Sequence, residues 1–142
     1  MDETLKTQAT QLLAQAHIDA PIMHLTPISK GGNNRLFKLQ TPTQTFALKQ
    51  YFRTPHDQRD RLASEVAFLR YAQTAAPTWV PAIYANDAST GLALYEFIEG
   101  SSITTPTEPM LLAARDFFKA TICPFRGTTT RNTEGKIACA CR

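Results

Sequence analysis

A lysine lies within a segment of otherwise alternating apolar residues, Thr45-Phe46-Ala47-Leu48-Lys49-Gln50-Tyr51. Side chains of a strand point alternately to its two faces, so Phe46 and Leu48 share one face while Lys49 lies on the other. The pattern predicts a strand that carries a cation on a half-buried face. A charged side chain that faces a core is costly unless it has a partner, so we look for a carboxylate that could pair with Lys49.

Sixteen residues further on, Glu65 lies within a predicted helix. We expect this helix to start with Thr54 as its cap and Pro55 as its first residue, and to run to about Gln73. At about 100° per residue, Glu65 falls inside the apolar arc of the helix, which comprises Leu62, Val66, Phe68, Leu69 and Ala72. Pairing of Lys49 with Glu65 would satisfy both charges. The alternative is that Glu65 lies at the edge of this face and Lys49 points to solvent.

The rest of the chain reads as short strands and two further helices. An amphipathic helix is expected at about 2–16, and a third helix at about 108–120. Strands are expected at about 24–28, 35–41, 45–51, 82–86 and 92–96, separated by turn-forming residues. The alternation and the turns predict antiparallel pairing of the first strands.

Two further segments flank the lysine strand. Gly31-Gly32 joins two strands just before it, and backbone amides in such a turn can approach a phosphate closely because no side chain intervenes. The second segment, Leu94-Tyr95-Glu96-Phe97-Ile98-Glu99-Gly100, is a strand that leads into an acidic and aromatic stretch. Taken singly, the first also fits an ordinary hairpin turn, and the second a buried strand followed by a loop.

Taken in order, these segments resemble the small lobe of the aminoglycoside phosphotransferase and choline kinase-like family. The resemblance covers about residues 20–120. Its motifs are Gly31-Gly32 with Asn34, Lys49 in Ala-Leu-Lys, Glu65 in Ser-Glu-Val-Ala-Phe-Leu, Val80-Pro81-Ala82-Ile83, and the 94–100 segment. It implies an α+β fold, the protein-kinase-like small lobe: a five-stranded antiparallel sheet with one main packed helix, plus an N-terminal helix and a helix after the hinge.

The resemblance also implies roles in binding ATP. Gly31, Gly32 and Asn34 would belong to the loop over the phosphates. Lys49, held by Glu65, would contact the α- and β-phosphates. The chain from Glu96 through Phe97 to Ile98 would offer backbone groups to the adenine. The glycine loop lacks the G-x-G-x-x-G pattern of protein kinases, so its detailed phosphate contacts are not carried over.

The catalytic part of such an enzyme has no counterpart in this sequence. In the family, a loop of the type His-x-Asp-x-x-x-x-Asn and a later aspartate orient the acceptor and bind magnesium. Here the histidines are His17, His24 and His56, and no aspartate follows Asp116. We therefore assign no catalytic and no metal-binding residue, and expect a truncated lobe that is inactive alone. The alternatives are a non-catalytic nucleotide-binding or protein-interaction module, and an unrelated α+β domain.

The domain organisation follows from a change of composition near Thr121. We expect an N-terminal helix over 1–20, the nucleotide-binding lobe with its hinge over 21–100, a linker and helix toward a missing large lobe over 101–120, and a disordered tail over 121–142. Residues 1–120 carry eleven basic and eleven acidic residues, whereas the tail carries a net charge of +3 and all three cysteines, Cys123, Cys139 and Cys141.

The tail could arise from a frameshift, which the coding DNA in its other two frames would test. A kinase large lobe encoded downstream in another frame would support this hypothesis. The competing interpretations, a metal held by the cysteines or RNA or membrane contact through the basic residues, rest on weaker patterns.

Composition limits the class of protein. Hydrophobic residues make up 43% and charged residues 19% of the 142 residues, as in globular proteins. The first twenty residues are polar, and no apolar run approaches the length of a membrane span. We expect a cytoplasmic protein whose partner is a nucleotide, with no nucleic-acid or membrane partner. A small-molecule acceptor is expected only for a full-length parent, and the exposed interlobe surface could support self-association.

Overall fold

The computed structural model describes residues 3–30, 34–52, 59–100 and 103–122. Backbone contacts divide the chain into two units, Met1–Thr105 and Pro106–Arg142, which are described separately. The expectations for Gly31, Gly32 and the tail beyond Ile122 lie outside the described residues, as do Thr54 and Pro55 themselves.

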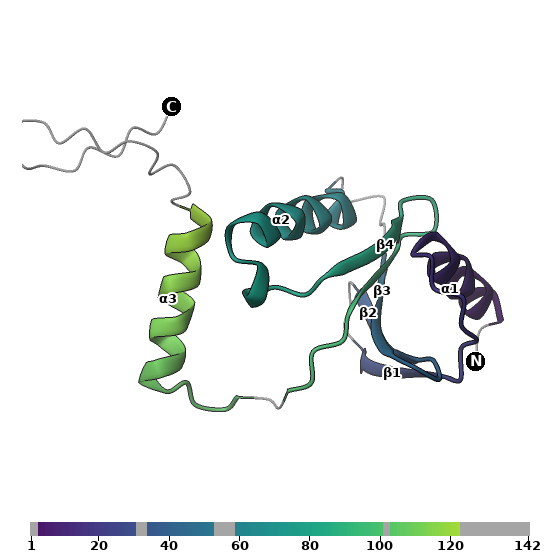
Figure 1. Ribbon diagram of the computed structural model, residues 1–142, viewed down its shortest axis with the longest axis horizontal. Coiled ribbons are helices and arrows are strands. Elements are labelled where there is room, and N and C mark those ends of the chain that lie inside the picture. The colour runs from purple at the N-terminus through teal and green to yellow at the C-terminus, as the bar shows by residue number, and fades with distance from the viewer. Residues whose placement is uncertain (1–2, 31–33, 53–58, 101–102, 123–142) are drawn as a thin grey trace, which may run out of the picture. The chain divides into compact units, whose positions relative to one another are not determined.

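Within the described part of the first unit, five strands form one antiparallel sheet in the order β1-β2-β3-β5-β4 (Figure 1). The strands are β1 (His24–Lys30), β2 (Asn34–Gln40), β3 (Thr45–Tyr51), β4 (Ile83–Asp87) and β5 (Leu92–Glu96). The central strand β3 pairs with β2 on one side and with β5 on the other. The predicted fold class, α+β with a five-stranded antiparallel sheet, is confirmed.

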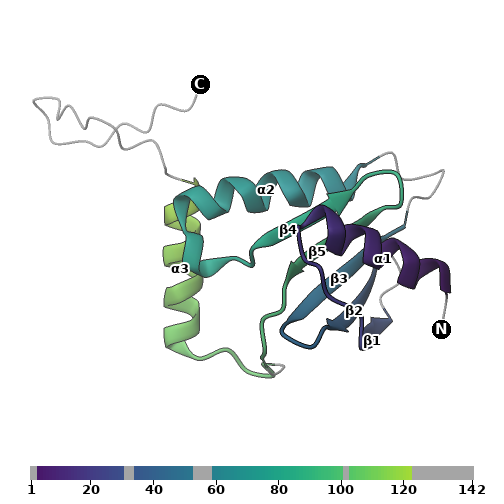
Figure 2. The ribbon, with the colours of Figure 1, turned by 45° about the vertical axis from the view of Figure 1, so that its right-hand side comes forward.

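One face of the sheet packs against α1 (Glu3–Gln15), which covers it in Figure 2. Because side chains alternate along a strand, Phe46 and Leu48 of β3 lie on this face beside their β5 neighbours. The core residues here are almost fully buried and comprise Leu5, Ala9, Leu12, Leu13, Leu25, Leu39, Phe46, Leu48, Leu92 and Leu94. This leaves Lys49 and Tyr51 to the opposite face.

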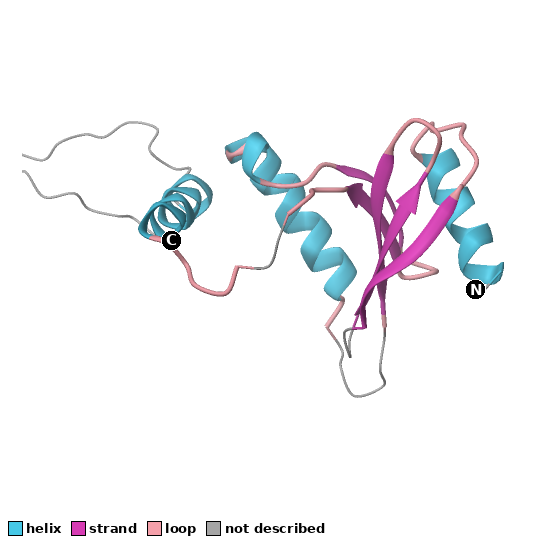
Figure 3. Ribbon diagram, turned by 90° about the horizontal axis from the view of Figure 1, so that it is seen from below, coloured by secondary structure: helices cyan, strands magenta, loops and turns pink. Residues whose placement is uncertain are grey.

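The opposite face carries α2 (Arg61–Ala75), so the sheet lies between the two helices (Figure 3). The buried residues of α2 are Leu62, Val66, Leu69 and Ala72, as the helical period predicts. A short 3-10 helix, η1 (Pro77–Trp79), follows α2 and was not predicted. Since Glu65 belongs to the same helix, this packing brings it toward the Lys49 face of the sheet.

Two predictions for α2 were wrong. The helix begins at Arg61 rather than near Thr54, because Asp60 is its cap and accepts a hydrogen bond from the Ala63 amide at 2.9 Å. Phe68, which was placed in the apolar arc, is 47% exposed. The packed stripe of α2 is therefore narrower than the arc drawn from the sequence.

The turn between β4 and β5 has a strict requirement for glycine. Gly91 has a φ of +69°, and a Cβ atom there would lie 2.8 Å from the backbone oxygen of Tyr51. The Tyr51 amide in turn donates to the Gly91 carbonyl at 2.8 Å. Gly91 therefore holds β5 against the end of β3, where Tyr51 lies.

The second unit contains α3 (Glu108–Ile122). Its apolar side chains Met110, Leu111, Leu112 and Phe118 are exposed. A search of the described residues finds no helix that is both long enough and apolar enough to span a bilayer.

Candidate functional site: a lysine–glutamate pair beside a cavity

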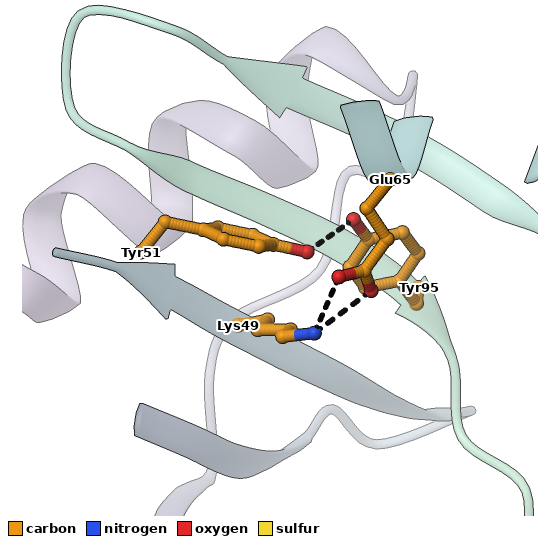
Figure 4. Close-up of polar contacts among 4 residues, drawn as sticks. All are labelled: Lys49, Tyr51, Glu65 and Tyr95. Carbon is orange, nitrogen blue, oxygen red and sulfur yellow. Dashed lines mark hydrogen bonds and ion pairs between the residues drawn. The ribbon is translucent and has the colours of Figure 1, made fainter. Parts of the chain in front are cut away.

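Lys49 and Glu65 form an ion pair between β3 and α2 (Figure 4). The Lys49 Nζ donates to Glu65 Oε1 at 2.8 Å and to Oε2 at 2.6 Å. The two side chains are 22% and 34% exposed, so the pair is partly shielded from water but open on one side. This is the pairing that the sequence predicted, and the alternative of a solvent-facing Lys49 is excluded by the geometry.

Two tyrosines surround the ion pair. The hydroxyl oxygens of Tyr51 and Tyr95 lie 2.8 Å apart, and the Nζ of Lys49 lies 4.9 Å from the centre of the Tyr51 ring. Burial raises the pKa of Tyr51 far above its usual range, and the hydrogen bond with Tyr95 and the charge of Glu65 add to the rise. Burial, opposed by the Tyr51 hydrogen bond and aided by Glu65, raises the pKa of Tyr95 to about 12. Both phenols are therefore neutral at ordinary pH.

The ion pair forms part of the wall of a cavity of about 600 Å³ in the first unit. That volume lies in the range of sites for small molecules and cofactors. The lining combines charged and polar side chains with aliphatic ones: Asn34, Leu36, Ala47, Lys49, Arg61, Glu65, Leu69, Pro81, Tyr95, Glu96 and Ile98. A ligand that carries both charged and apolar groups would match this mixed lining.

Asn34 lines this cavity and has one unsatisfied polar atom. Its side-chain oxygen is buried and has no hydrogen-bond partner among the described residues. Leaving such an acceptor unpaired costs about 1–3 kcal/mol. A ligand that donates a hydrogen bond to Asn34 would recover this cost.

The segment after β5 is fixed by side-chain contacts. The Glu96 amide donates to the Ala82 carbonyl at 2.8 Å, and its carboxylate accepts from the Ala82 amide at 3.0 Å. The Nζ of Lys38 lies 4.7 Å from the centre of the Phe97 ring. No backbone hydrogen bond of Phe97 or Ile98 is found within the described part of the chain. Since the Glu96 amide already donates to Ala82, the nearest backbone groups that could form hydrogen bonds with a ligand are those of Phe97 and Ile98.

The cavity gathers five of the residues singled out from the sequence: Asn34, Lys49, Glu65, Glu96 and Ile98. The side chain of Phe97 instead contacts Lys38, and Gly31 and Gly32 lie outside the described residues.

Sequence reasoning missed Arg61 and Tyr95 as lining residues. Arg61 precedes Glu65 by four residues, so the helical period of the predicted helix could have placed it beside Glu65. Tyr95 is opposite Ala47 in the pairing of β3 with β5, which only the strand register reveals.

Within the residues that the structure describes, no three His, Cys, Asp or Glu side chains lie close enough to hold a metal ion. The fold and the ion pair define a small α+β lobe of the kind found in kinase-like phosphotransferases. A family model for the phosphotransferase enzyme family matches residues 24–120. The chain belongs to this family, as its motifs predicted. No curated protein matches the chain.

Proposed function

We propose that this lobe binds ATP in the cavity beside the Lys49–Glu65 pair. The observation that carries the proposal is a half-buried cation, oriented by a carboxylate, at the wall of a cavity of about 600 Å³. Phosphotransferases of this family generally use ATP, and a lysine fixed by a helix glutamate is the common phosphate contact of kinase-like lobes. Membership in the family and the mixed polar and aliphatic lining of the cavity both support a nucleotide.

The residues of the cavity fit the parts of ATP. Lys49 would contact the α- and β-phosphates, and Asn34 lies on the strand that follows the Gly31-Gly32 loop. The unpaired Asn34 oxygen would accept a hydrogen bond from a hydroxyl of the nucleotide. Leu36, Ala47 and Ile98 offer apolar surface to the adenine, and the backbone at Phe97 and Ile98 offers hydrogen bonds.

We further propose that the lobe derives from an enzyme that phosphorylates a hydroxyl of a small molecule, and that this chain alone does not turn over. Transfer needs an aspartate beside the acceptor hydroxyl and ligands for magnesium. The sequence contains no His-x-Asp-x-x-x-x-Asn segment. Magnesium would enter with ATP, bound to its phosphates.

Titration of the purified chain with ATP tests the proposal. We expect saturable binding that Lys49→Ala weakens by about tenfold or more, because a charge-assisted contact to phosphate is worth about 1.5–3 kcal/mol. Lys119→Ala, at an exposed position on α3, is the matched control and should bind as the wild type does. Equal ATP affinity in the wild type and Lys49→Ala would refute the assigned role. Phosphorylation of an aminoglycoside or amino alcohol by the chain alone, abolished by Lys49→Ala, would refute the proposed inactivity.

A protein-interaction module is the second candidate, and one observation favours it. Phe68, Tyr71 and Trp79, on α2 and η1, are 47%, 41% and 50% exposed. We propose that this aromatic surface supports self-association of the chain. Size-exclusion chromatography over a hundredfold range of concentration would show a dimer that Phe68→Ser and Trp79→Ser dissolve. A monomer throughout this range would exclude the candidate.

A further inference from the structure

The tyrosines beside the ion pair have no role in the function proposed so far. Tyr51 and Tyr95 are 6% and 4% exposed, and they come from β3 and β5 on the same face of the sheet. Two buried phenols facing each other are costly unless their hydroxyls are paired. Their arrangement therefore needs an explanation beyond filling the space under α2, which apolar side chains would fill at lower cost.

The contacts of Tyr51 reach both members of the ion pair. Its ring face lies 4.9 Å from the Lys49 Nζ, within the range of a cation–π interaction. Its hydroxyl is joined to that of Tyr95 in Figure 4, and the charge of Glu65 raises the pKa of both phenols. One tyrosine thus contacts the cation through its ring and approaches the anion through its hydroxyl.

The two phenols together have one more hydroxyl proton than their mutual hydrogen bond uses. Two neutral phenols carry two hydroxyl protons, and their mutual hydrogen bond at 2.8 Å uses one of them. Whichever phenol donates in that bond, the other keeps a proton that needs an acceptor. The Glu65 carboxylate of the ion pair is an acceptor group, and its charge acts on the pKa of both phenols.

We propose that Tyr51 and Tyr95 are positioning residues that hold Lys49 and Glu65 in one arrangement before a nucleotide arrives. The ring of Tyr51 limits the movement of the ammonium group, and the paired hydroxyls fix the carboxylate that orients it. Tyr95 also lines the cavity. Preorganisation of this kind raises affinity because fewer side chains lose freedom on binding. The expected gain in ATP affinity rests on the proposed nucleotide site. The expected restriction of the Lys49 side chain does not depend on it.

The test uses Tyr51→Phe and Tyr95→Phe, which each remove one oxygen and keep the ring. Tyr71→Phe, at a tyrosine on the exposed side of α2, is the matched control. The first readout is the carbon signal of the Lys49 ε-methylene in lysine-labelled protein, assigned by its loss in Lys49→Arg. We expect this signal to move in both variants and to stay in place in Tyr71→Phe. An unchanged Lys49 signal in both variants would overturn the proposal. This measurement needs no nucleotide.

The second readout compares ATP with adenosine. A positioning role predicts that each variant binds ATP roughly three- to tenfold more weakly, the worth of one hydrogen bond, while adenosine binds as before. A general loss of structure would weaken both ligands equally and would count against the role. If the wild type binds no ATP, the proposed function fails, and the Lys49 signal alone decides this inference.

A third measurement avoids substitution altogether. In the wild type, nuclear Overhauser contacts between the Tyr51 ring protons and the Lys49 ε-methylene protons should be present without nucleotide. Their absence would overturn the proposal even if both phenylalanine variants failed to fold.

Discussion

Lys49 contributes to the site through its position more than through its charge alone. A partly exposed ion pair stabilises a protein by only about 0–1 kcal/mol. The Lys49–Glu65 pair, at 22% and 34% exposure, is therefore a weak contribution to folding. The ion pair changes the stability of the fold little, and Glu65 holds the ammonium group of Lys49 at the cavity wall. A cation that binds phosphate requires such a fixed position.

The buried phenols give the first prediction at this scale, a loss of stability at alkaline pH. The pKa of Tyr95 is raised to about 12 from its usual 10.0, and that of Tyr51 is raised further. The unfolded chain releases these protons near pH 10. Stability is therefore fully present below about pH 10 and is lost as the pH rises toward the folded pKa.

Urea unfolding of the wild type and of Tyr51→Phe/Tyr95→Phe, measured in steps from pH 8 to pH 11, checks this prediction. The free energy of unfolding of the wild type should fall more steeply than that of the double variant. Lys49 and Glu65 are present in both proteins, so the difference between the curves reports the phenols. Parallel curves would show that the phenols ionise equally in the folded and unfolded chains.

At the scale of elements, the site depends on how β5 meets β3. Gly91→Ala should destabilise the first unit by at least about 2 kcal/mol, because the added Cβ meets the Tyr51 carbonyl at 2.8 Å and φ is +69°. Thermal unfolding followed by circular dichroism measures the loss. Gly100→Ala is the matched control, since no atom lies within 4 Å of its added Cβ. An unchanged melting temperature for Gly91→Ala would contradict the strained turn.

The sequence predicted the strands better than the helix start. The bounds of β3 and β5 match the predicted 45–51 and 92–96. Alternation marks the first part of β3, and β5 is a short apolar run that ends at Glu96. The start of α2 was misplaced because Thr54 and Pro55 fit the pattern of a helix start, whereas in the structure Asp60 accepts the hydrogen bond from the Ala63 amide. Helical angles gave the pairing of Glu65 with Lys49, but they could not tell that Phe68 lies beyond the packed stripe.

The pairing of Tyr51 with Tyr95 was beyond the reach of local patterns. The contact joins residues 44 positions apart. It requires knowledge that β3 pairs with β5 rather than with β4, and of the register that sets Ala47 opposite Tyr95. Local alternation gives the face of a side chain but not its neighbour on the next strand.

At the scale of the whole molecule, the two faces of the sheet differ in what they hold. The face under α1 holds the apolar core, and the face under α2 holds the ion pair and the tyrosines. This division means that binding in the cavity should leave the α1 side undisturbed. If packing transmitted strain through the sheet, binding in the cavity would also change the surroundings of the core residues under α1, contrary to this expectation.

The central claim, that a nucleotide binds in the cavity on the α2 side, is tested most directly by the methyl spectrum of the leucine- and isoleucine-labelled chain during titration with ATP. The account predicts saturable shifts for Leu36, Leu69 and Ile98, which line the cavity, and unmoved signals for Leu5, Leu12 and Leu13 of α1. Signals that stay in place at millimolar ATP, or that move only on the α1 side, would contradict it.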